Sequence, residues 1–159
     1  MDNHKKGRLV VLIDYENIAR SLIEKGMILD IKELRNFLKK MGEVLFAFIF
    51  VPDHYVYSLP EDLNNLGYQI VLCQKLKGFD RDKDMVDAQI NLIGSVFCQF
   101  SEITDIVIVS NDADMVRLAG MAELRGKRVH VFGTEKISSV YKRVVDVENI
   151  HEIASSKEK

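Results

Sequence analysis

The sequence has few of the features that mark secreted, disulfide-stabilised or zinc-binding proteins. It contains two cysteines in 159 residues, Cys73 and Cys98, and they form no C-x-x-C pair. We expect both to be buried, reduced side chains. The four histidines are scattered without the spacing of metal ligands, so a zinc site is not expected.

Long apolar segments with membrane or export character are also lacking. The apolar run that follows the basic N-terminal residues, 9–13, is too short for a signal peptide or a membrane span. With no other targeting signal, the expected location is cytoplasmic, with no membrane partner. The formal net charge of −2 gives no overall attraction to nucleic acid. A surface that binds a polyanion must therefore be local.

Glycine-rich phosphate-binding motifs are absent as well. The sequence contains neither a P-loop nor a G-x-G-x-x-G fingerprint, which disfavours nucleotide-dependent enzymes. Repeats and low-complexity segments are missing too, and the length suits one domain with a substantial core. We expect this domain to cover residues 1–153 and residues 154–159 to form a frayed C-terminal tail.

Short apolar runs alternate with helical patterns along the chain. Runs that are apolar on successive residues predict strands covered on both faces, and they occupy residues 9–13, 44–51, 68–73, 106–109 and 128–132. Helical patterns lie at residues 31–41, 53–66 (weaker, interrupted at Pro60), 84–97, 115–124 and 138–145. Asp30 and Gly126 are placed as helix caps. The alternation predicts a three-layer α/β/α sandwich with a mostly parallel, roughly five-stranded sheet.

Acidic residues gather where the first and fourth strands end. Asp14 closes the first strand, and Asp112 and Asp114 follow the fourth. The helix that follows the third strand begins near Asp84, and at 100° per residue Asp84 and Asp87 lie within about 60° of each other. Since the carboxyl ends of parallel strands meet at one edge of a sheet, the acids are expected to converge there.

Two interpretations of these acids compete. An aspartate between a strand and a helix often caps the helix, and acids in a first turn suit the helix dipole. Carboxylates packed together, however, repel one another unless a cation neutralises them. A hard divalent ion, Mg²⁺ or Mn²⁺, prefers such an oxygen-rich site. A site of this kind suits hydrolysis of phosphodiester bonds.

Basic residues near the acids are candidates for contact with phosphate. The segment "QKLKGFDRDKD" supplies four of them, and Arg117 lies close to Asp114 in sequence. A charged segment of this kind is also compatible with a merely solvated surface. Arg125, Lys127 and Arg128 are expected at the opposite edge of the sheet. The four cations of the segment are Lys75, Lys77, Arg81 and Lys83.

Four stretches together resemble the NYN domain, in particular its LabA-like branch, within the PIN-like nuclease superfamily. They are "VVLIDYENI", "KGFDRDKDMVDAQI", "IVIVSNDADMVRLAGMAELRGKRVHVFG" and "SSVYKRVVDVENIHEI". The resemblance spans nearly the whole chain. It implies a PIN-like fold and a metal-dependent ribonuclease site.

Carried over by position, the resemblance assigns roles to individual residues. Asp14 and Asp112 would be metal ligands, and Asp114 would bind metal directly or through water. The middle carboxylate is ambiguous among Asp80, Asp82, Asp84 and Asp87, with Asp84 preferred and Asp87 next. The implied catalytic set is Asp14, Asn17, Asp84 and Asp112. The residues expected to contact substrate, which include the basic residues chosen for their position beside the acids, are Asn17, Ser110, Asn111, Arg117 and the four cations of the basic segment.

Three functions are compared. A ribonuclease that takes RNA as substrate accounts for the acidic edge and the resemblance. A catalytically silent module that binds RNA or a protein partner, or pairs as a homodimer, is the alternative. A receiver-like phosphoacceptor fits worse, because the third strand ends in Gln74-Lys75 and not in an acceptor aspartate.

Overall fold

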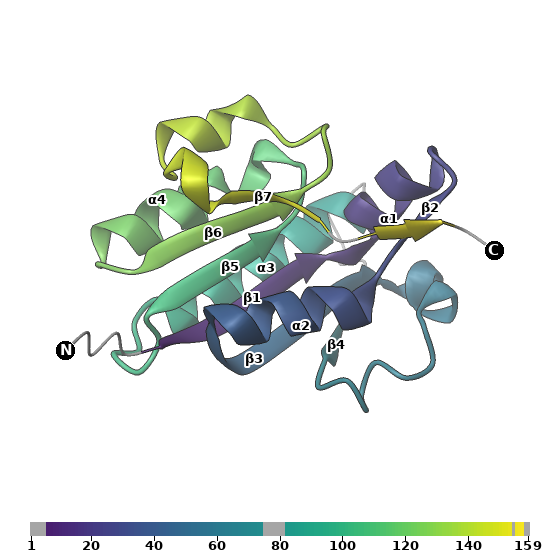
Figure 1. Ribbon diagram of the computed structural model, residues 1–159, viewed down its shortest axis with the longest axis horizontal. Helices are drawn as coiled ribbons and strands as arrows, with labels where there is room; N and C mark the ends of the chain where they lie inside the picture. Colours follow the sequence, from purple (N-terminus) through teal and green to yellow (C-terminus); the bar gives the residue numbers. More distant parts are fainter. Residues whose placement is uncertain (1–5, 75–81, 154, 158–159) are drawn as a thin grey trace.

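The computed structural model describes residues 6–74, 82–153 and 155–157, and for residues 82–84 it describes the backbone only. Six strands form one sheet in which every pairing between neighbours is parallel (Figure 1). The order across the sheet is β4-β3-β1-β5-β6-β7. The strands are β1 (Gly7–Asp14), β3 (Gly42–Pro52), β4 (Gln69–Cys73), β5 (Asp105–Val109), β6 (Arg128–Gly133) and β7 (Ile150–Glu152).

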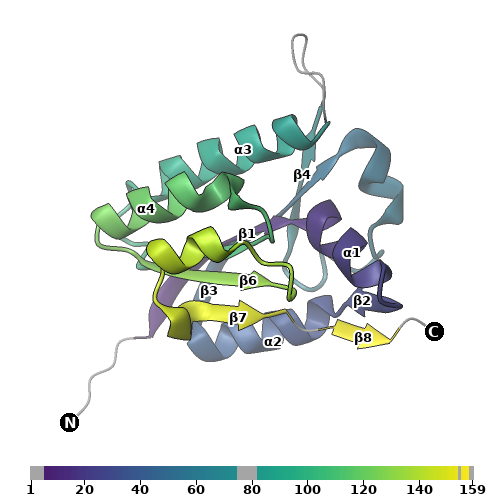
Figure 2. The same ribbon diagram turned by 90° about the horizontal axis from the view of Figure 1, so that it is seen from above.

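Helices cover both faces of this sheet, as the alternation of runs predicted (Figure 2). Helices α1 (Tyr15–Ile23) and α2 (Ile31–Met41) pack on one face, and α3 (Asp82–Phe97) and α4 (Val116–Leu124) pack on the other. The three-layer α/β/α architecture is therefore confirmed. The described chain also contains short 3-10 helices: η1 (Asp53–Ser58), η2 (Ala113–Met115), η3 (Ser139–Arg143) and η4 (Val147–Asn149).

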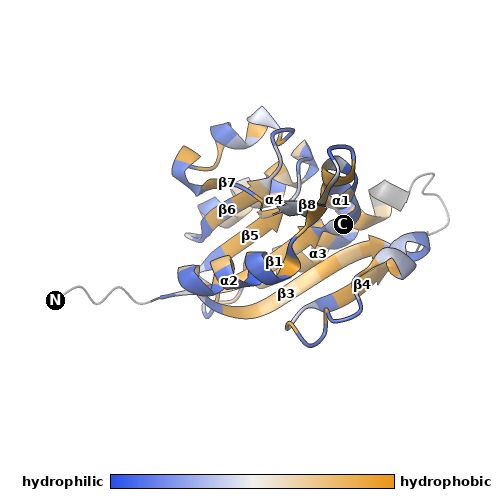
Figure 3. Ribbon diagram, turned by 45° about the vertical axis from the view of Figure 1, so that its right-hand side comes forward, coloured by the Kyte–Doolittle hydropathy of each residue, from blue (hydrophilic) through white to orange (hydrophobic). Residues whose placement is uncertain are grey.

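The central strands are buried on both faces, which explains their continuous apolar sequences (Figure 3). Along β1, Val11 and Ile13 pack with α1 and α2, whereas Val10 and Leu12 pack with α3 and α4. All four side chains are fully buried. At about 1.5–3 kcal/mol for each buried aliphatic side chain, strand β1 contributes strongly to both halves of the core.

Two local predictions about helix ends are confirmed. The Asp30 side chain accepts a hydrogen bond from the Glu33 amide at 2.9 Å and so caps α2. Gly126 has φ of 78°, a conformation that favours glycine, and it ends α4. Cys73 and Cys98 are both buried and free.

Several expected boundaries were wrong. The sheet has a sixth strand, β7, and the helix α1 follows β1 directly. In place of a helix at 53–66 the chain forms η1, which ends before Pro60, and in place of one at 138–145 it forms η3. Residues 155–157 are not frayed: they form β8 (Ser155–Lys157), which pairs antiparallel with β2 (Met27–Leu29).

The strand order indicates which edge of the sheet is expected to bind ligands. From β1 the chain builds β3 and β4 on one side, and β5, β6 and β7 are added on the other. The order therefore reverses between β1 and β5, and in open α/β sheets ligands bind at the carboxyl ends of such strands. Among the described residues, no helix is both long and apolar enough to cross a membrane.

A buried acid at the opposite edge gives a prediction about stability. Asp105 begins β5 and is buried; it accepts hydrogen bonds from His130 (2.8 Å) and Thr104 (2.6 Å). Burial opposes ionisation, but these bonds, with the charge of Arg128, outweigh it and lower the pKa of Asp105. A lowered pKa in the folded state stabilises the protein above the unfolded pKa, and this stabilisation is lost as the pH falls through the folded value.

We therefore expect Asp105→Asn to lower the free energy of unfolding by about 2 kcal/mol at pH 7, because bonds to a charged acceptor are lost. The difference from wild type should narrow as the pH falls below about 4, where Asp105 of the unfolded chain takes up a proton, and it should be lost as the pH falls through the lowered pKa of folded Asp105. Urea denaturation between pH 3 and pH 7 measures it. Glu102→Gln, at an exposed neighbouring acid, is the matched control. A constant difference at every pH would contradict the account.

Candidate metal centre at the carboxyl edge of the sheet

Asp14 occupies the last position of the central strand β1. Its side chain is only 5% exposed, and it accepts a hydrogen bond from the Ser110 hydroxyl at 3.2 Å. Although Asp14 immediately precedes α1, its side chain makes no capping hydrogen bond to that helix. Helix capping therefore does not explain this acid.

Asp112 follows the adjacent strand β5 through a tight turn. The Asp112 amide donates to the Ser110 hydroxyl at 3.1 Å, which bends the chain out of the strand. The Asp112 carbonyl accepts a hydrogen bond from the Tyr141 hydroxyl, which comes from η3. The Asp112 side chain makes no capping hydrogen bond to η2. The capping interpretation fails here too.

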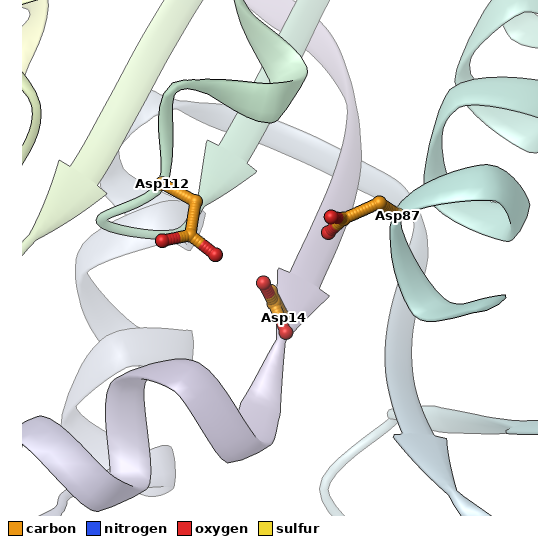
Figure 4. A group of neighbouring side chains, drawn as sticks. All are labelled: Asp14, Asp87 and Asp112. Carbon is orange, nitrogen blue, oxygen red and sulfur yellow. The ribbon is translucent and has the colours of Figure 1, made fainter. Parts of the chain in front are cut away.

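Asp87 approaches from the helix α3, whose apolar residues Val86 and Ile90 are buried against the sheet. One carboxylate oxygen of each of Asp14, Asp87 and Asp112 lies within 4.8 Å of the other two. The three side chains point toward one another (Figure 4). Two neighbouring strands and a helix thus bring together acids that are far apart in the sequence.

The carboxylates of this cluster repel one another when no cation is bound. Burial, first, and then a hydrogen bond with Asp114 and the charges of Asp14, Asp114 and Asp112 raise the pKa of Asp87 to about 8. Oδ1 of Asp87 is buried and has no hydrogen-bond partner among the described residues. An oxygen that has lost its water without gaining a donor is costly. A cation at this point would remove both the repulsion and the missing interaction.

A polar network holds the β1 and β5 ends together. The Asn17 side-chain oxygen accepts the Asn111 amide at 2.9 Å. The Asn111 side chain in turn exchanges two hydrogen bonds with Thr134, at 2.9 and 2.8 Å, and Thr134 contacts the Ser21 hydroxyl at 2.9 Å. These bonds join α1, the end of β5 and the end of β6. They fix the spacing on which the acidic cluster depends.

Other predicted residues take different positions. Ser110 and Asn111 are buried within the protein, and their contact with substrate stays a prediction. Asn17 lines a cleft of about 340 Å³ with Asp14 and Asp112. Arg117 and Asp114 line a second cleft, of about 520 Å³, beside Asn91.

Part of the predicted set lies outside the described side chains. Lys75, Lys77, Asp80 and Arg81 lie outside the described residues. Asp82, Lys83 and Asp84 belong to the first turn of α3, where only the backbone is described. Asp87, the second candidate for the middle carboxylate, is the described side chain of α3 that lies with Asp14 and Asp112. Lys127 and Arg128 line a cleft at the other edge of the sheet, where they were expected.

Three polar residues of the acidic cleft were not predicted from the sequence. Glu16, Arg20 and His54 line it together with Asp14, Asn17 and Asp112. The helical spacing of Glu16 and Arg20 would have indicated the first two, had α1 been recognised. His54 comes just after the strand β3, so the same strand-end rule that found Asp14 could have found it.

The parallel sheet and the acids at its carboxyl edge are consistent with a PIN-like domain. A family model for the NYN domain matches residues 8–152, and the chain belongs to this family. NYN domains are part of the PIN-like nuclease superfamily.

Two similar proteins bear on the fold and its extent. An uncharacterized protein of Methanocaldococcus jannaschii is 27% identical over 128 residues, which cover 80% of this chain and 48% of that protein. This chain thus spans about half the length of that relative. A crystal structure of a protein of unknown function from Vibrio parahaemolyticus superposes with a TM-score of 0.79 at 20% identity, covering 97% of both chains. That likeness supports the fold.

Proposed function

We propose that the protein is a metal-dependent ribonuclease that hydrolyses phosphodiester bonds of RNA. The observation that carries this proposal is the meeting of Asp14, Asp87 and Asp112, with oxygens within 4.8 Å of one another, at the point where strand order reverses. Membership of a family within a nuclease superfamily agrees with it. Assignment to the LabA-like branch stays a prediction from the motifs.

The cluster fits Mg²⁺ or Mn²⁺. All three side chains offer carboxylate oxygens, the ligands that hard divalent ions prefer. The buried Asp87 oxygen without a hydrogen-bond donor is suited to a cation. Such an ion, when bound, lowers the pKa of a bound water and stabilises charge on the scissile phosphate. Asp114 is proposed as a further ligand, directly or through water, because it contacts Asp87.

The surrounding residues would orient the reactants. The Ser110 hydroxyl fixes the Asp14 carboxylate by donating to it. Asn17 is held by the Asn111 amide through its side-chain oxygen, and it lines the cleft. We propose that the Asn17 side-chain nitrogen donates to a phosphate oxygen of RNA. Arg117, beside Asp114, is proposed to contact a neighbouring phosphate.

The proposal is tested by comparing the protein with and without divalent metal. We expect the purified protein to cleave a fluorescently labelled RNA in Mn²⁺ or Mg²⁺ and to stop in excess EDTA. Mn²⁺ at about 100 times its dissociation constant should raise the melting temperature by about 5–10 °C, since binding to the folded state alone stabilises it. Gel electrophoresis measures the first effect and differential scanning calorimetry the second.

The two measurements separate the proposal from its alternative. Ca²⁺ provides a control for general ionic effects. If none of these ions stabilises the protein or supports cleavage, the proposal is contradicted. That result would favour a silent module that binds RNA or a protein partner. Cleavage that continues in EDTA would contradict a role for the metal.

A further inference from the structure

The mouth of the acidic cleft carries basic side chains that the proposed chemistry does not use. Arg20 contacts the Glu16 carboxylate at 2.5 Å, and Nε2 of His54 lies 3.7 Å from the same oxygen. The Arg20 and His54 side chains are 65% and 52% exposed, against 19% for Glu16. The Glu16 carboxylate, which is the least exposed of the three groups, therefore lies next to the exposed side chains of Arg20 and His54. All three line the cleft beside Asp14 and Asp112.

The geometry of η1 extends this mouth. In a 3-10 helix residues i and i+3 lie on the same face, about 6 Å apart along the axis. Tyr57 therefore shares a face with His54, the residue that lines the cleft. Its side chain is 94% exposed. An aromatic ring so placed contributes little to the core and leaves its face available for stacking.

Tyr55 anchors η1 to the body of the protein. Its ring lies 6.2 Å from that of Tyr15 and 6.4 Å from that of His54. Tyr15, the first residue of α1, is buried in the core cluster, and Tyr55 packs against the same cluster. Tyr55 thus holds η1 against the core, while His54 and Tyr57 on the same segment are exposed.

We propose that Arg20, His54 and Tyr57, here called the η1 rim, bind the RNA strand that enters the acidic cleft. Arg20 engages a backbone phosphate with guanidinium N–H groups that Glu16 does not use. The Tyr57 ring stacks on a base, with His54 between the two contacts. Stacking on a side chain requires a base that is not already stacked in a duplex, so the rim selects RNA that is unpaired at this point.

This inference rests on the proposed function, because it takes RNA as the ligand. The test measures binding without cleavage: fluorescence anisotropy of a labelled 12-nucleotide oligouridylate at low salt in EDTA. Tyr57→Ala should weaken binding about tenfold, in line with the loss of one stacked base. Tyr57→Phe should bind as wild type does, and Arg20→Ala should also weaken binding. A 12-base-pair RNA duplex should bind Tyr57→Ala and wild type equally.

The control variant is Leu124→Ala, since Leu124 is 91% exposed at the end of α4, away from the cleft. Its affinity should equal that of wild type. Equal binding of oligouridylate by wild type and Tyr57→Ala overturns the inference, even where the wild-type protein cleaves RNA. A loss of affinity confined to Tyr57→Ala and Arg20→Ala supports the inference, even if the cleavage proves to come from a contaminating nuclease.

Discussion

Replacing Asp14 by asparagine is expected to reduce RNA cleavage by about 10³-fold, equivalent to about 4 kcal/mol of lost transition-state stabilisation. Asp14 is the acid that closes the central strand, and it belongs to the group with Asp87 and Asp112. Asparagine keeps an oxygen that can accept the Ser110 hydroxyl. The substitution therefore removes the charge while it preserves the shape.

The rate should be measured under single-turnover conditions with saturating Mn²⁺ and labelled RNA. Glu123→Gln is the matched control, because Glu123 is an exposed acid on α4 that lines the cleft at the opposite edge of the sheet. Its rate should stay within twofold of wild type. Cleavage by Asp14→Asn at the wild-type rate would assign the activity to a contaminating nuclease. Circular dichroism of both variants checks that the fold is retained.

The sheet could be predicted because its central strands are covered on both faces. A strand buried on two sides needs apolar residues in succession, and residues 9–13 and 106–109 show such runs clearly. The sixth strand, β7, could not be found this way. It is three residues long and includes His151 and Glu152, so its pairing with β6 is determined by the tertiary structure.

The helix α1 escaped prediction for a related reason. It begins at Tyr15, directly after the last residue of β1, with no side-chain cap to mark the boundary. The apolar run 9–13 and Asp14 predict the end of a strand at this point but no helix after it. Once the segment that follows Asp14 is helical, Arg20 falls one turn after Glu16, which accounts for the ion pair at the cleft.

Two of the three clustered acids could be predicted from the rule that ligands bind at the carboxyl ends of parallel strands. The third could not be predicted from that rule alone. Asp14 and Asp112 end neighbouring parallel strands, so the sequence could place them together. The choice between Asp84 and Asp87 depends on the rotation of α3 about its axis, which packing against the sheet decides. The residues from η1 and η3, such as His54 and Tyr141, depend on contacts across many residues of sequence.

The other large effect is expected from Asp87→Asn, and it concerns stability. In the metal-free protein, burial and the neighbouring acids raise the pKa of Asp87 from 3.8 to about 8. The folded protein then holds a proton that the unfolded chain releases above pH 3.8. Wild-type stability should therefore fall as the pH rises from about 4 to about 8. Asparagine cannot ionise, so the variant should lack this fall and exceed wild type in stability at pH 8.

Mn²⁺ should reverse the order of the two proteins. With the metal bound, the charge of Asp87 becomes favourable, and wild type should gain stability at pH 8 while Asp87→Asn gains far less. Urea denaturation at pH 5, 6.5 and 8, in EDTA and in Mn²⁺, measures both effects. Asp62→Asn, at an exposed acid between η1 and β4, should follow wild type throughout. Parallel profiles for Asp87→Asn and wild type in EDTA would contradict the raised pKa of Asp87, which burial, the hydrogen bond with Asp114 and the neighbouring acidic charges produce.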